Sequence, residues 1–307
     1  MTPLDAVRLN FSPNTLVLMN LIIGLILFGV ALDLKVSDFT RVLRHPRAPV
    51  TGLVCQFLVL PALTFALIPL LSPSPSMALG MLLVASCPGG NLSNFMTHWA
   101  RGDVGASVSM SAVSTAAAIV VTPFNLAFWG SLRPDTAALL RDVALSPLQM
   151  GQTIAVLLVI PCAVGMTVAA RAPRVAERLR VPMQRFSLIA FGGFVCAAFA
   201  GNFDHFVSWV ALAFLPVAVM NGLALLVGYG AGRVVGATEP EQRAIAIEVG
   251  IQNSGLGLIL VFDFFDGLGG MAVICAWWGI WHILSGLVVS SWWRSRPVAS
   301  IQVVEGT

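Results

Sequence analysis

Charged residues are scarce in this sequence: Asp, Glu, Lys and Arg make up 10% of its 307 residues. A soluble domain usually contains about 25% charged residues, because its surface must be hydrated. Hydrophobic residues make up 57% of the chain, and they come in runs of about 20, long enough to cross a bilayer as helices. The sequence therefore predicts an all-α polytopic membrane protein and excludes an ordinary soluble globule.

Cysteines are also few, and none of their spacings is typical of a metal site. All five lie in apolar segments, where we expect reduced packing residues: Cys55, Cys87, Cys162, Cys196 and Cys275. The net charge of +3 does not indicate a nucleic-acid partner. The basic residues lie in the connections between apolar runs, where membrane topology accounts for them.

Nine apolar segments follow one another along the chain and predict nine transmembrane helices. They are 14–34, 48–71, 77–100, 104–129, 147–170, 186–203, 206–232, 243–262 and 269–293. The first lacks the basic flank and the cleavage site of a signal peptide, so we count it as a span. The longest connection, 131–146, separates four spans from five.

The basic residues predict the orientation of these spans. If the N-terminus lies outside, all of the 17 Lys and Arg residues except Arg8, Arg133 and Arg141 fall on the cytoplasmic side. Short cytoplasmic loops of membrane proteins carry such an excess of Lys and Arg. We therefore expect the N-terminus outside and the C-terminus inside.

The third and the eighth spans are both interrupted near their centres. Residues 88–90 (Pro-Gly-Gly) cannot continue a regular helix without cost, and Asn91 and Ser93 are suitable caps for a second half. In the eighth span, Gly250 and Asn253 mark a similar break. Two interrupted spans at corresponding points of two halves indicate a carrier built from inverted repeats.

Glu248 is the acidic residue that lies well inside an apolar span. A carboxylate there is costly unless it has a cation, a proton or a hydrogen-bond partner. It could be a protonated glutamate bonded to a neighbouring helix, or it could reach water past Arg243. Gln252 lies one turn on, and the carbonyls freed at the break are hard oxygen donors, which favours a bound sodium ion. A lone acid could also carry a proton.

Polar side chains in two further spans could complete such a site. Ser107 and Ser111 are four residues apart, so they lie on one face of a helix. Small hydroxyl residues also let membrane helices pack closely, and this alternative stays open. Gln56 is isolated in the second span and needs a polar partner.

Three motifs together resemble the bile acid:sodium symporter family. They are Cys87-Pro88-Gly89-Gly90 with Ser93-Asn94, the stretch from Arg101-Gly102 to Ser114-Thr115, and the stretch from Glu248 to Gly255. The resemblance runs from about Phe28 to Trp292. It implies a nine-helix variant of the ten-helix bacterial members, with two crossing discontinuous helices. It also implies that the single membrane domain, 1–307, has a panel part (14–34 and 147–203) and a core part (48–129 and 206–293).

The resemblance implies two sodium sites as the only cofactor sites. The first would use Ser93, Asn94, Ser107, Ser111 and Glu248. The second would use Gln56, Glu248, Gln252 and the backbone carbonyls of Val249 and Ile251. Ser111 stands where a close relative has threonine, which keeps the hydroxyl.

The resemblance also implies an anion site in the cleft between core and panel. The implied residues are Asn91, Leu92, Asn253, Gly255 and His282. The N-termini of the half-helices favour an anion there by their partial positive charge. Ile283 follows His282 where a relative has asparagine, which is a departure from the family's bile acid contacts. His282 could equally be a packed interior histidine.

The expected function is sodium-coupled symport of an organic anion, such as a bile acid, pantoate or another small carboxylate, by alternating access. The main alternative is a proton-coupled carrier that uses Glu248. A membrane enzyme is disfavoured because no nucleophile–base motif appears. A channel is disfavoured because paired broken helices fit alternating access. We expect a multi-pass protein of a cell membrane, the bacterial inner membrane, with no required oligomer.

Overall fold

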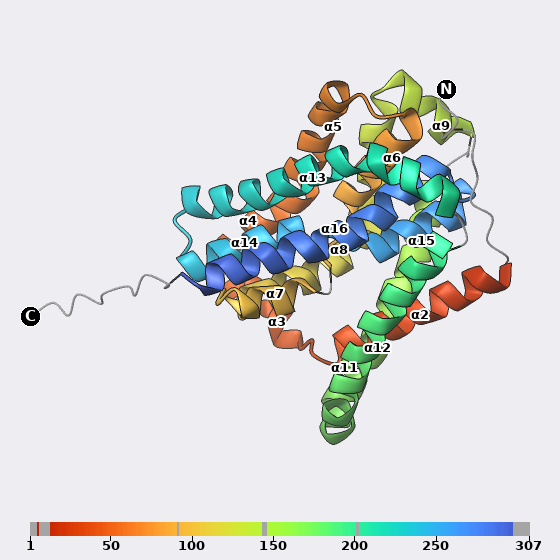
Figure 1. Cartoon of the computed structure of the whole chain (residues 1–307). Helices are drawn as coiled ribbons and strands as arrows, with labels where there is room; N and C mark the ends of the chain where they lie inside the picture. The colour runs from red at the N-terminus through yellow and green to blue at the C-terminus, as the bar shows by residue number, and fades with distance from the viewer. Residues whose placement is uncertain (1–4, 6–12, 91, 143–145, 201–202, 297–307) are drawn as a thin grey trace, which may run out of the picture.

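The computed structural model describes residues 5, 13–90, 92–142, 146–200 and 203–296, and the regular secondary structure of these residues is helical (Figure 1). The first half contains α2 (Pro13–Ala31), α3 (Val36–Arg44), α4 (Arg47–Val54), the π-helical turn η1 (Cys55–Val59), α5 (Leu60–Leu71), α6 (Pro75–Ser86), α7 (Ser93–Trp99) and α8 (Val104–Ser131). The second half contains α9 (Pro134–Asp142), α10 (Pro147–Ile154), η2 (Ala155–Val159), α11 (Ile160–Arg171), α12 (Pro173–Ala200), α13 (Phe203–Val234), α14 (Glu239–Gly250), α15 (Ser254–Phe265) and α16 (Gly269–Arg294).

Helix occupies most of every predicted apolar segment. Among the described residues, five continuous helical segments are long and apolar enough to cross a membrane: Arg47–Leu71, Val104–Ser131, Pro147–Arg171, Trp209–Val234 and Gly269–Arg294. The prediction of an all-α polytopic membrane protein is therefore confirmed. Two short helices were not predicted: α3, and α9 inside the connection 131–146.

Both predicted interruptions are present. The third span divides into α6 and α7, and the eighth into α14 and α15. Asn253 caps α15, because its side chain accepts from the backbone N–H of Leu256 at 3.0 Å. The prediction that Ser93 caps α7 is wrong: Ser93 is the first helical residue, and its hydroxyl lies 3.3 Å from that of Ser111 on α8. Asn91 lies outside the described residues.

The two interruptions cross and exchange backbone hydrogen bonds. The N–H of Gly90 donates to the carbonyl of Ile251 at 2.6 Å, and the N–H of Asn253 donates to the carbonyl of Pro88 at 2.9 Å. Gly89 and Gln252 form an isolated antiparallel bridge between these two bonds. The backbone groups released by each broken helix are thus satisfied by the other, as burial requires.

Close helix contacts hold the crossing in place. Gly228 of α13 faces α14 so closely that a Cβ there would lie 2.8 Å from the Cα of Ala246. Small residues of this kind let membrane helices approach each other. Arg243, 2% exposed, donates to the carbonyl of Ala100 at 2.8 Å and to that of Trp293 at 3.1 Å. This arginine ties the start of α14 to the ends of α7 and α16.

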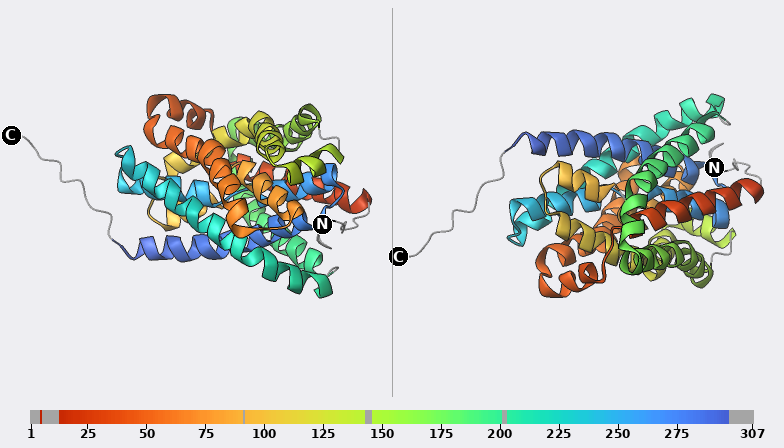
Figure 2. Two further views of the ribbon diagram at one scale, coloured as in Figure 1. Left: turned by 90° about the horizontal axis from the view of Figure 1, so that it is seen from above. Right: turned by 90° about the horizontal axis from the view of Figure 1, so that it is seen from below.

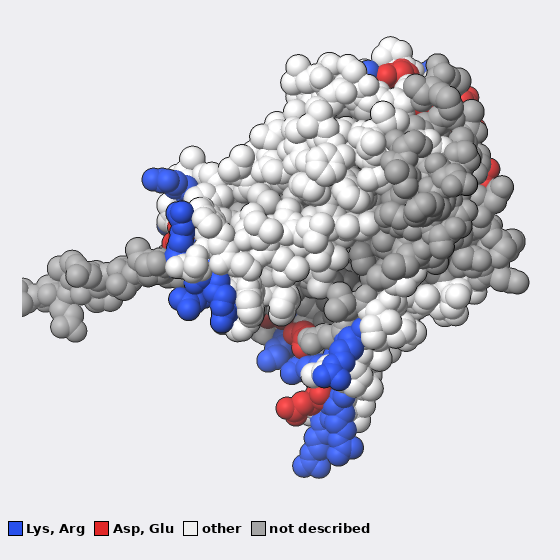
Figure 3. Space-filling model, viewed as in Figure 1, with Lys and Arg blue, Asp and Glu red and all other residues white. Residues whose placement is uncertain are grey.

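The helices α2, α11 and α12 pack against one another in the lower right of Figure 1, and the three lie side by side again in Figure 2. The remaining long helices surround the crossing, with α10 packed on α8. Basic side chains gather along one side of the molecule, at the ends of α13 and α16 and around α3 and the start of α12 (Figure 3).

Candidate ion-binding site

Glu248 is the centre of the candidate site and is fully buried. Its α14 segment faces α8, and the hydroxyl of Ser111 donates to the two carboxylate oxygens at 2.8 and 3.0 Å. The hydroxyl of Ser107, one turn earlier on α8, lies 3.5 Å from Glu248 Oε2. The shared helix face predicted for the two serines is therefore turned toward the carboxylate.

Asn94 of α7 connects to the same serines. Its Oδ1 accepts from the Ser107 hydroxyl at 2.8 Å and lies 3.5 Å from the Ser111 hydroxyl. Ser93, fully buried, lies beside Ser111. The five residues assigned to a first sodium site thus form one hydrogen-bonded cluster. Thr97, which the sequence analysis missed, joins it through a 3.2 Å contact with the Ser107 hydroxyl.

A second group of oxygen atoms lies around Gln56. Its Nε2 donates to the carbonyl of Cys87 and to Oε1 of Gln252, both at 3.3 Å. Gln252 in turn donates to the carbonyl of Val249 at 2.7 Å. The carbonyl of Ile251 accepts from Gly90 in the crossing. The Oε1 atom of Gln56 is buried and has no hydrogen-bond partner, which leaves a buried acceptor for a further ligand.

The π-helical turn η1 positions Gln56. Pro61 has no N–H and cannot donate to the carbonyl of Phe57 four residues earlier. Asn125 of α8 supplies the missing donor through a 2.7 Å hydrogen bond from its Nδ2 to that carbonyl. Asn125 was also not identified from the sequence, although an amide in an apolar run is the signal that identified Gln56.

Gly89 is required by the approach of Glu248. A Cβ atom at this position would collide with Oε1 and Cδ of Glu248. The prediction that Gly89 breaks a helix is confirmed, but the structure adds a second reason for glycine here. The backbone of the break lies directly against the buried carboxylate.

The donor set fits a hard cation such as sodium. All candidate ligands are oxygen atoms: one carboxylate, several hydroxyls and amides, and backbone carbonyls. A serine oxygen can donate to the carboxylate or present a lone pair to a cation. Within the described residues, no group of three or more His, Cys, Asp or Glu side chains could hold a metal ion. Oxygen-only sites suit alkali and alkaline-earth ions, whereas transition metals favour imidazole and thiolate.

The residues proposed for the anion are placed less closely together. Leu92 and Asn253 lie at the starts of α7 and α15, and Gly255 is in the first turn of α15. His282 is buried on α16, one turn before Gly286, which packs against Met96 of α7. Its Nδ1 has no hydrogen-bond partner. Among the residues that the structure describes, no hydrogen bond joins the His282 side chain to the starts of α7 and α15; Asn91 lies outside these residues.

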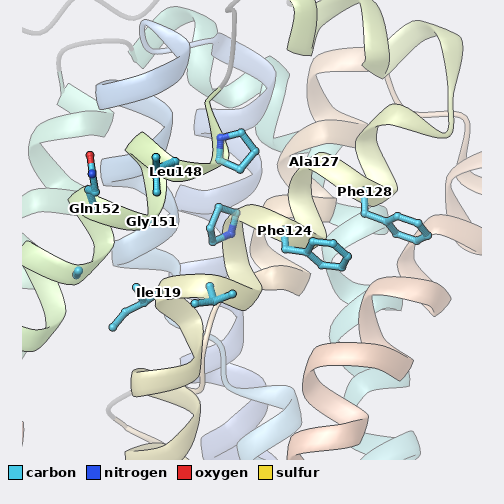
Figure 4. A pocket seen from close by; sticks show the side chains of 11 residues that line it. Ile119, Phe124, Ala127, Phe128, Leu148, Gly151 and Gln152 are labelled. Atoms are coloured by element: carbon cyan, nitrogen blue, oxygen red, sulfur yellow. The ribbon is translucent and has the colours of Figure 1, made fainter.

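An open groove of about 710 Å³ lies between α8 and α10–η2 (Figure 4). Its lining comes from residues 119–128 and 147–155, and Gln152 is the one lining residue with a hydrogen-bonding side chain. Such a surface offers no charge to an anion. We therefore do not place the anion in this groove, although the groove lies between segments that the resemblance assigns to the core and to the panel.

Comparison with known proteins identifies the family. The model of the sodium bile acid symporter family matches residues 20–209. The uncharacterized sodium-dependent transporter YocS of Bacillus subtilis is 31% identical over 274 residues, which cover 89% of this chain and 82% of YocS. This match shows that the similarity continues beyond the region of the family model.

Two eukaryotic relatives agree with this assignment. The probable chloroplastic sodium/metabolite cotransporter BASS2 of Oryza sativa subsp. japonica is 30% identical over 281 residues, covering 89% of this chain and 63% of the rice protein. The ileal sodium/bile acid cotransporter of Cricetulus griseus is 28% identical over 242 residues, covering 78% of this chain and 67% of the hamster protein. The resemblance predicted from the motifs is confirmed: the chain belongs to the sodium bile acid symporter family, and it is a membrane transporter rather than an enzyme.

Proposed function

We propose that this protein couples the inward movement of sodium ions to that of an organic anion. The observation that carries the proposal is Glu248, a fully buried carboxylate contacted by the hydroxyls of Ser107 and Ser111, with the amide oxygen of Asn94 bound to the same Ser107 hydroxyl. A cation would compensate its charge at the centre of the helix crossing. The names of YocS, BASS2 and the ileal transporter all specify sodium, which supports sodium over a proton.

We further propose two sodium sites that share Glu248. The first is formed by the Ser93, Asn94, Ser107 and Ser111 cluster. The second is formed by Gln56, Gln252 and the carbonyls of Val249 and Ile251. A cation there would take the place of the Gln252 amide N–H that the Val249 carbonyl now accepts. Because both ions use one carboxylate, binding of either would reorient the ligands of the other. The buried unpartnered oxygen of Gln56 supports a cation on that side.

The proposed mechanism is alternating access between a core and a panel. The panel would consist of α2, α10–η2–α11 and α12, and the core of the helices around the crossing. The mutual packing of α2, α11 and α12 supports this division. We propose nine spans with the N-terminus outside, supported by the basic side chains gathered on one side (Figure 3), in the bacterial inner membrane.

The proposed cargo is a small organic anion, such as a bile acid, pantoate or another carboxylate. The starts of α7 and α15 meet at the crossing, and their N–H groups and dipoles favour negative charge. The relatives' names refer to bile acids and to metabolites, which supports an organic substrate. A proton-coupled carrier that uses Glu248 is the second candidate, since a buried carboxylate can also bind a proton.

Uptake into proteoliposomes tests this proposal. Purified protein is reconstituted, and radiolabelled bile acid, pantoate and pyruvate are offered with an inward sodium gradient or with the same potassium gradient. We expect at least one anion to accumulate with the sodium gradient but not with the potassium gradient. Equal uptake with sodium and potassium for every transported anion would contradict sodium coupling.

A further inference from the structure

The helix crossing has an approximate two-fold relationship that extends beyond its backbone pairing. The offset along the chain from Gly89 to Gln252 also separates Pro88 from Ile251, and Gly90 from Asn253. Exchanging each residue for the one related to it by this offset converts the Gly90–Ile251 backbone hydrogen bond into the Asn253–Pro88 backbone hydrogen bond. The same offset relates Cys87, at the end of α6, to Gly250, at the end of α14.

The carbonyls of these two related residues are bound in the same way. The carbonyl of Cys87 accepts from Nε2 of Gln56 at 3.3 Å. The carbonyl of Gly250 accepts from Nδ2 of Asn221 at 2.7 Å. Both amide side chains have no exposed surface, and in both the amide oxygen has no hydrogen-bond partner. Each amide is therefore anchored to the end of a half-helix by its nitrogen.

The helices that carry the two amides also correspond. Gln56 lies on the helical segment immediately before α6, and Asn221 lies on α13, immediately before α14. The two amides correspond in the backbone group that they contact, not in their position along the helix. The π-helical turn η1 contains Gln56 and rotates its side chain relative to a regular α-helix. An amide in an apolar run is costly unless it is hydrogen-bonded, and here both amides donate hydrogen bonds to the backbone of the crossing.

The two sides of the crossing differ in the side chains that face them. The offset that relates the breaks carries Glu248 back to Ala85, and Gln252 back to Gly89. The side that corresponds to Asn221 therefore has neither a carboxylate nor a second amide to complete a cation cage. Asn221 consequently acts on the backbone of the break and is not itself an ion ligand.

The backbone atom that Asn221 holds lies between two proposed ligands. Gly250 ends α14, and its carbonyl receives no N–H from Ser254, which donates to Gln252 instead. Val249 and Ile251 flank Gly250 and supply carbonyls to the proposed second sodium site. The hydrogen bond from Asn221 on α13 holds the Gly250 carbonyl in place. The neighbouring peptide planes, which carry the Val249 and Ile251 carbonyls, are thereby restricted in orientation.

We propose that Asn221 is a positioning residue for the second sodium ion, the counterpart in the second repeat of Gln56 in the first. The inference rests on the proposed function, because it requires sodium to bind to the carbonyls of the break. It predicts that Asn221 controls sodium affinity at one of two sites, whereas the affinity for the anion at saturating sodium depends on other residues.

Equilibrium binding of ²²Na⁺ to the purified full-length protein tests the inference, together with sodium-dependent uptake. Asn221→Leu removes the hydrogen bond and keeps the branch at Cγ, with a larger side chain. Asn221→Gln keeps the amide and copies the side chain found at the related position. Thr136→Val is the matched control, because the buried Thr136 hydroxyl donates to the carbonyl of Gly130, away from the crossing, at 2.6 Å. Asn221→Ser replaces the leucine variant if that variant does not fold.

We expect two binding components in the wild type and in Thr136→Val. In Asn221→Leu one of the two components should move to roughly ten-fold higher sodium, the scale of one buried hydrogen bond. The Hill coefficient of uptake should fall toward one, with the anion KM at saturating sodium unchanged. Asn221→Gln should recover part of the affinity.

Two results would overturn the inference alone: unchanged sodium binding in Asn221→Leu, or equal loss in Asn221→Leu and Thr136→Val. A wild-type protein that binds no ²²Na⁺ would instead contradict the proposed function, and the inference with it.

Discussion

The hydroxyl of Ser111 donates to both carboxylate oxygens of Glu248, at 2.8 Å to Oε1 and 3.0 Å to Oε2. Ser111 lies on α8 and Glu248 on α14, so the contact joins two helices that are far apart in the sequence. It also places a hydroxyl oxygen where it can leave the carboxylate and bind a cation. Ser107 lies one turn earlier on α8, with its hydroxyl 3.5 Å from Glu248 Oε2, so both serines belong to the candidate site.

Replacement of Ser111 by alanine should weaken sodium binding without abolishing transport. The Ser111 hydroxyl oxygen is one neutral ligand among several in the proposed first sodium site, so its loss should raise the sodium concentration for half-maximal uptake roughly ten-fold, or about 1.4 kcal/mol of sodium binding free energy. Ser114→Ala is the control, because the buried Ser114 hydroxyl donates only to the carbonyl of Ser111 among the contacts described. Sodium titration of uptake measures both. An equal effect of the two substitutions would show that Ser111 is a packing residue.

Replacement of Glu248 by glutamine should abolish sodium-driven uptake. The amide keeps the shape of the side chain but removes the charge that both proposed ions share. The exposed Glu177 on α12 offers the same chemical change as a control, and Glu177→Gln should transport normally. Initial rates of labelled anion uptake with a sodium gradient measure the effect. Full sodium-dependent uptake by Glu248→Gln would disprove the shared-carboxylate assignment.

Replacement of Gly89 by alanine should destabilise the crossing and stop transport, since the new methyl group meets the Glu248 carboxylate. Overpacking of this kind typically costs about 1–3 kcal/mol of folding free energy. Gly230→Ala on α13 is the matched control, because a Cβ there meets no atom within 4 Å. That substitution should be neutral or stabilising by up to about 1 kcal/mol. Thermal unfolding of the purified variants distinguishes the two; equal melting temperatures would contradict the described contact.

The orientation of the spans can be tested with single introduced cysteines. Cysteines at Arg174 and Arg296 should react only with reagents that reach the cytoplasm, and one at Arg133 should react from outside. The reason is the concentration of basic residues on one side of the nine-span arrangement. Labelling with an impermeant maleimide, before and after permeabilisation, measures accessibility, with the unsubstituted protein as control. Outside labelling at position 174 would require a different span count.

The sequence predicted the parts of the fold that depend on composition and on backbone chemistry. Long apolar runs gave the helices, and Pro88 with its two following glycines gave one break, because these residues disfavour helix wherever they lie. The helix α9 was missed because a helix of nine residues outside the apolar runs has little periodic signal. The cap at Ser93 was wrong because its hydroxyl has a tertiary partner, which local preference cannot show.

The candidate site was predicted only in part from the residues themselves. Glu248 and Gln56 were identified because a buried polar group in an apolar run is costly. Asn221 carries the same signal, but its role depends on the carbonyl of Gly250, which only the three-dimensional crossing reveals. The division into two sodium sites came from the family resemblance. The residues alone predict several oxygen ligands near one carboxylate, but not how many ions these ligands bind.

The most direct test of coupling measures sodium and anion movement in the same proteoliposomes. Sodium is set equal on both sides with tracer ²²Na⁺ outside, and an inward gradient of a transported bile acid, pantoate or pyruvate is imposed. Two sodium ions and one monovalent anion carry one net positive charge inward, and 100 mV, inside negative, contributes about 2.3 kcal/mol to that movement. We expect the anion gradient to drive ²²Na⁺ uptake, two ions per anion, faster when valinomycin makes the interior negative. Anion uptake that moves no ²²Na⁺ and follows a pH gradient alone would contradict sodium symport and make Glu248 a proton carrier.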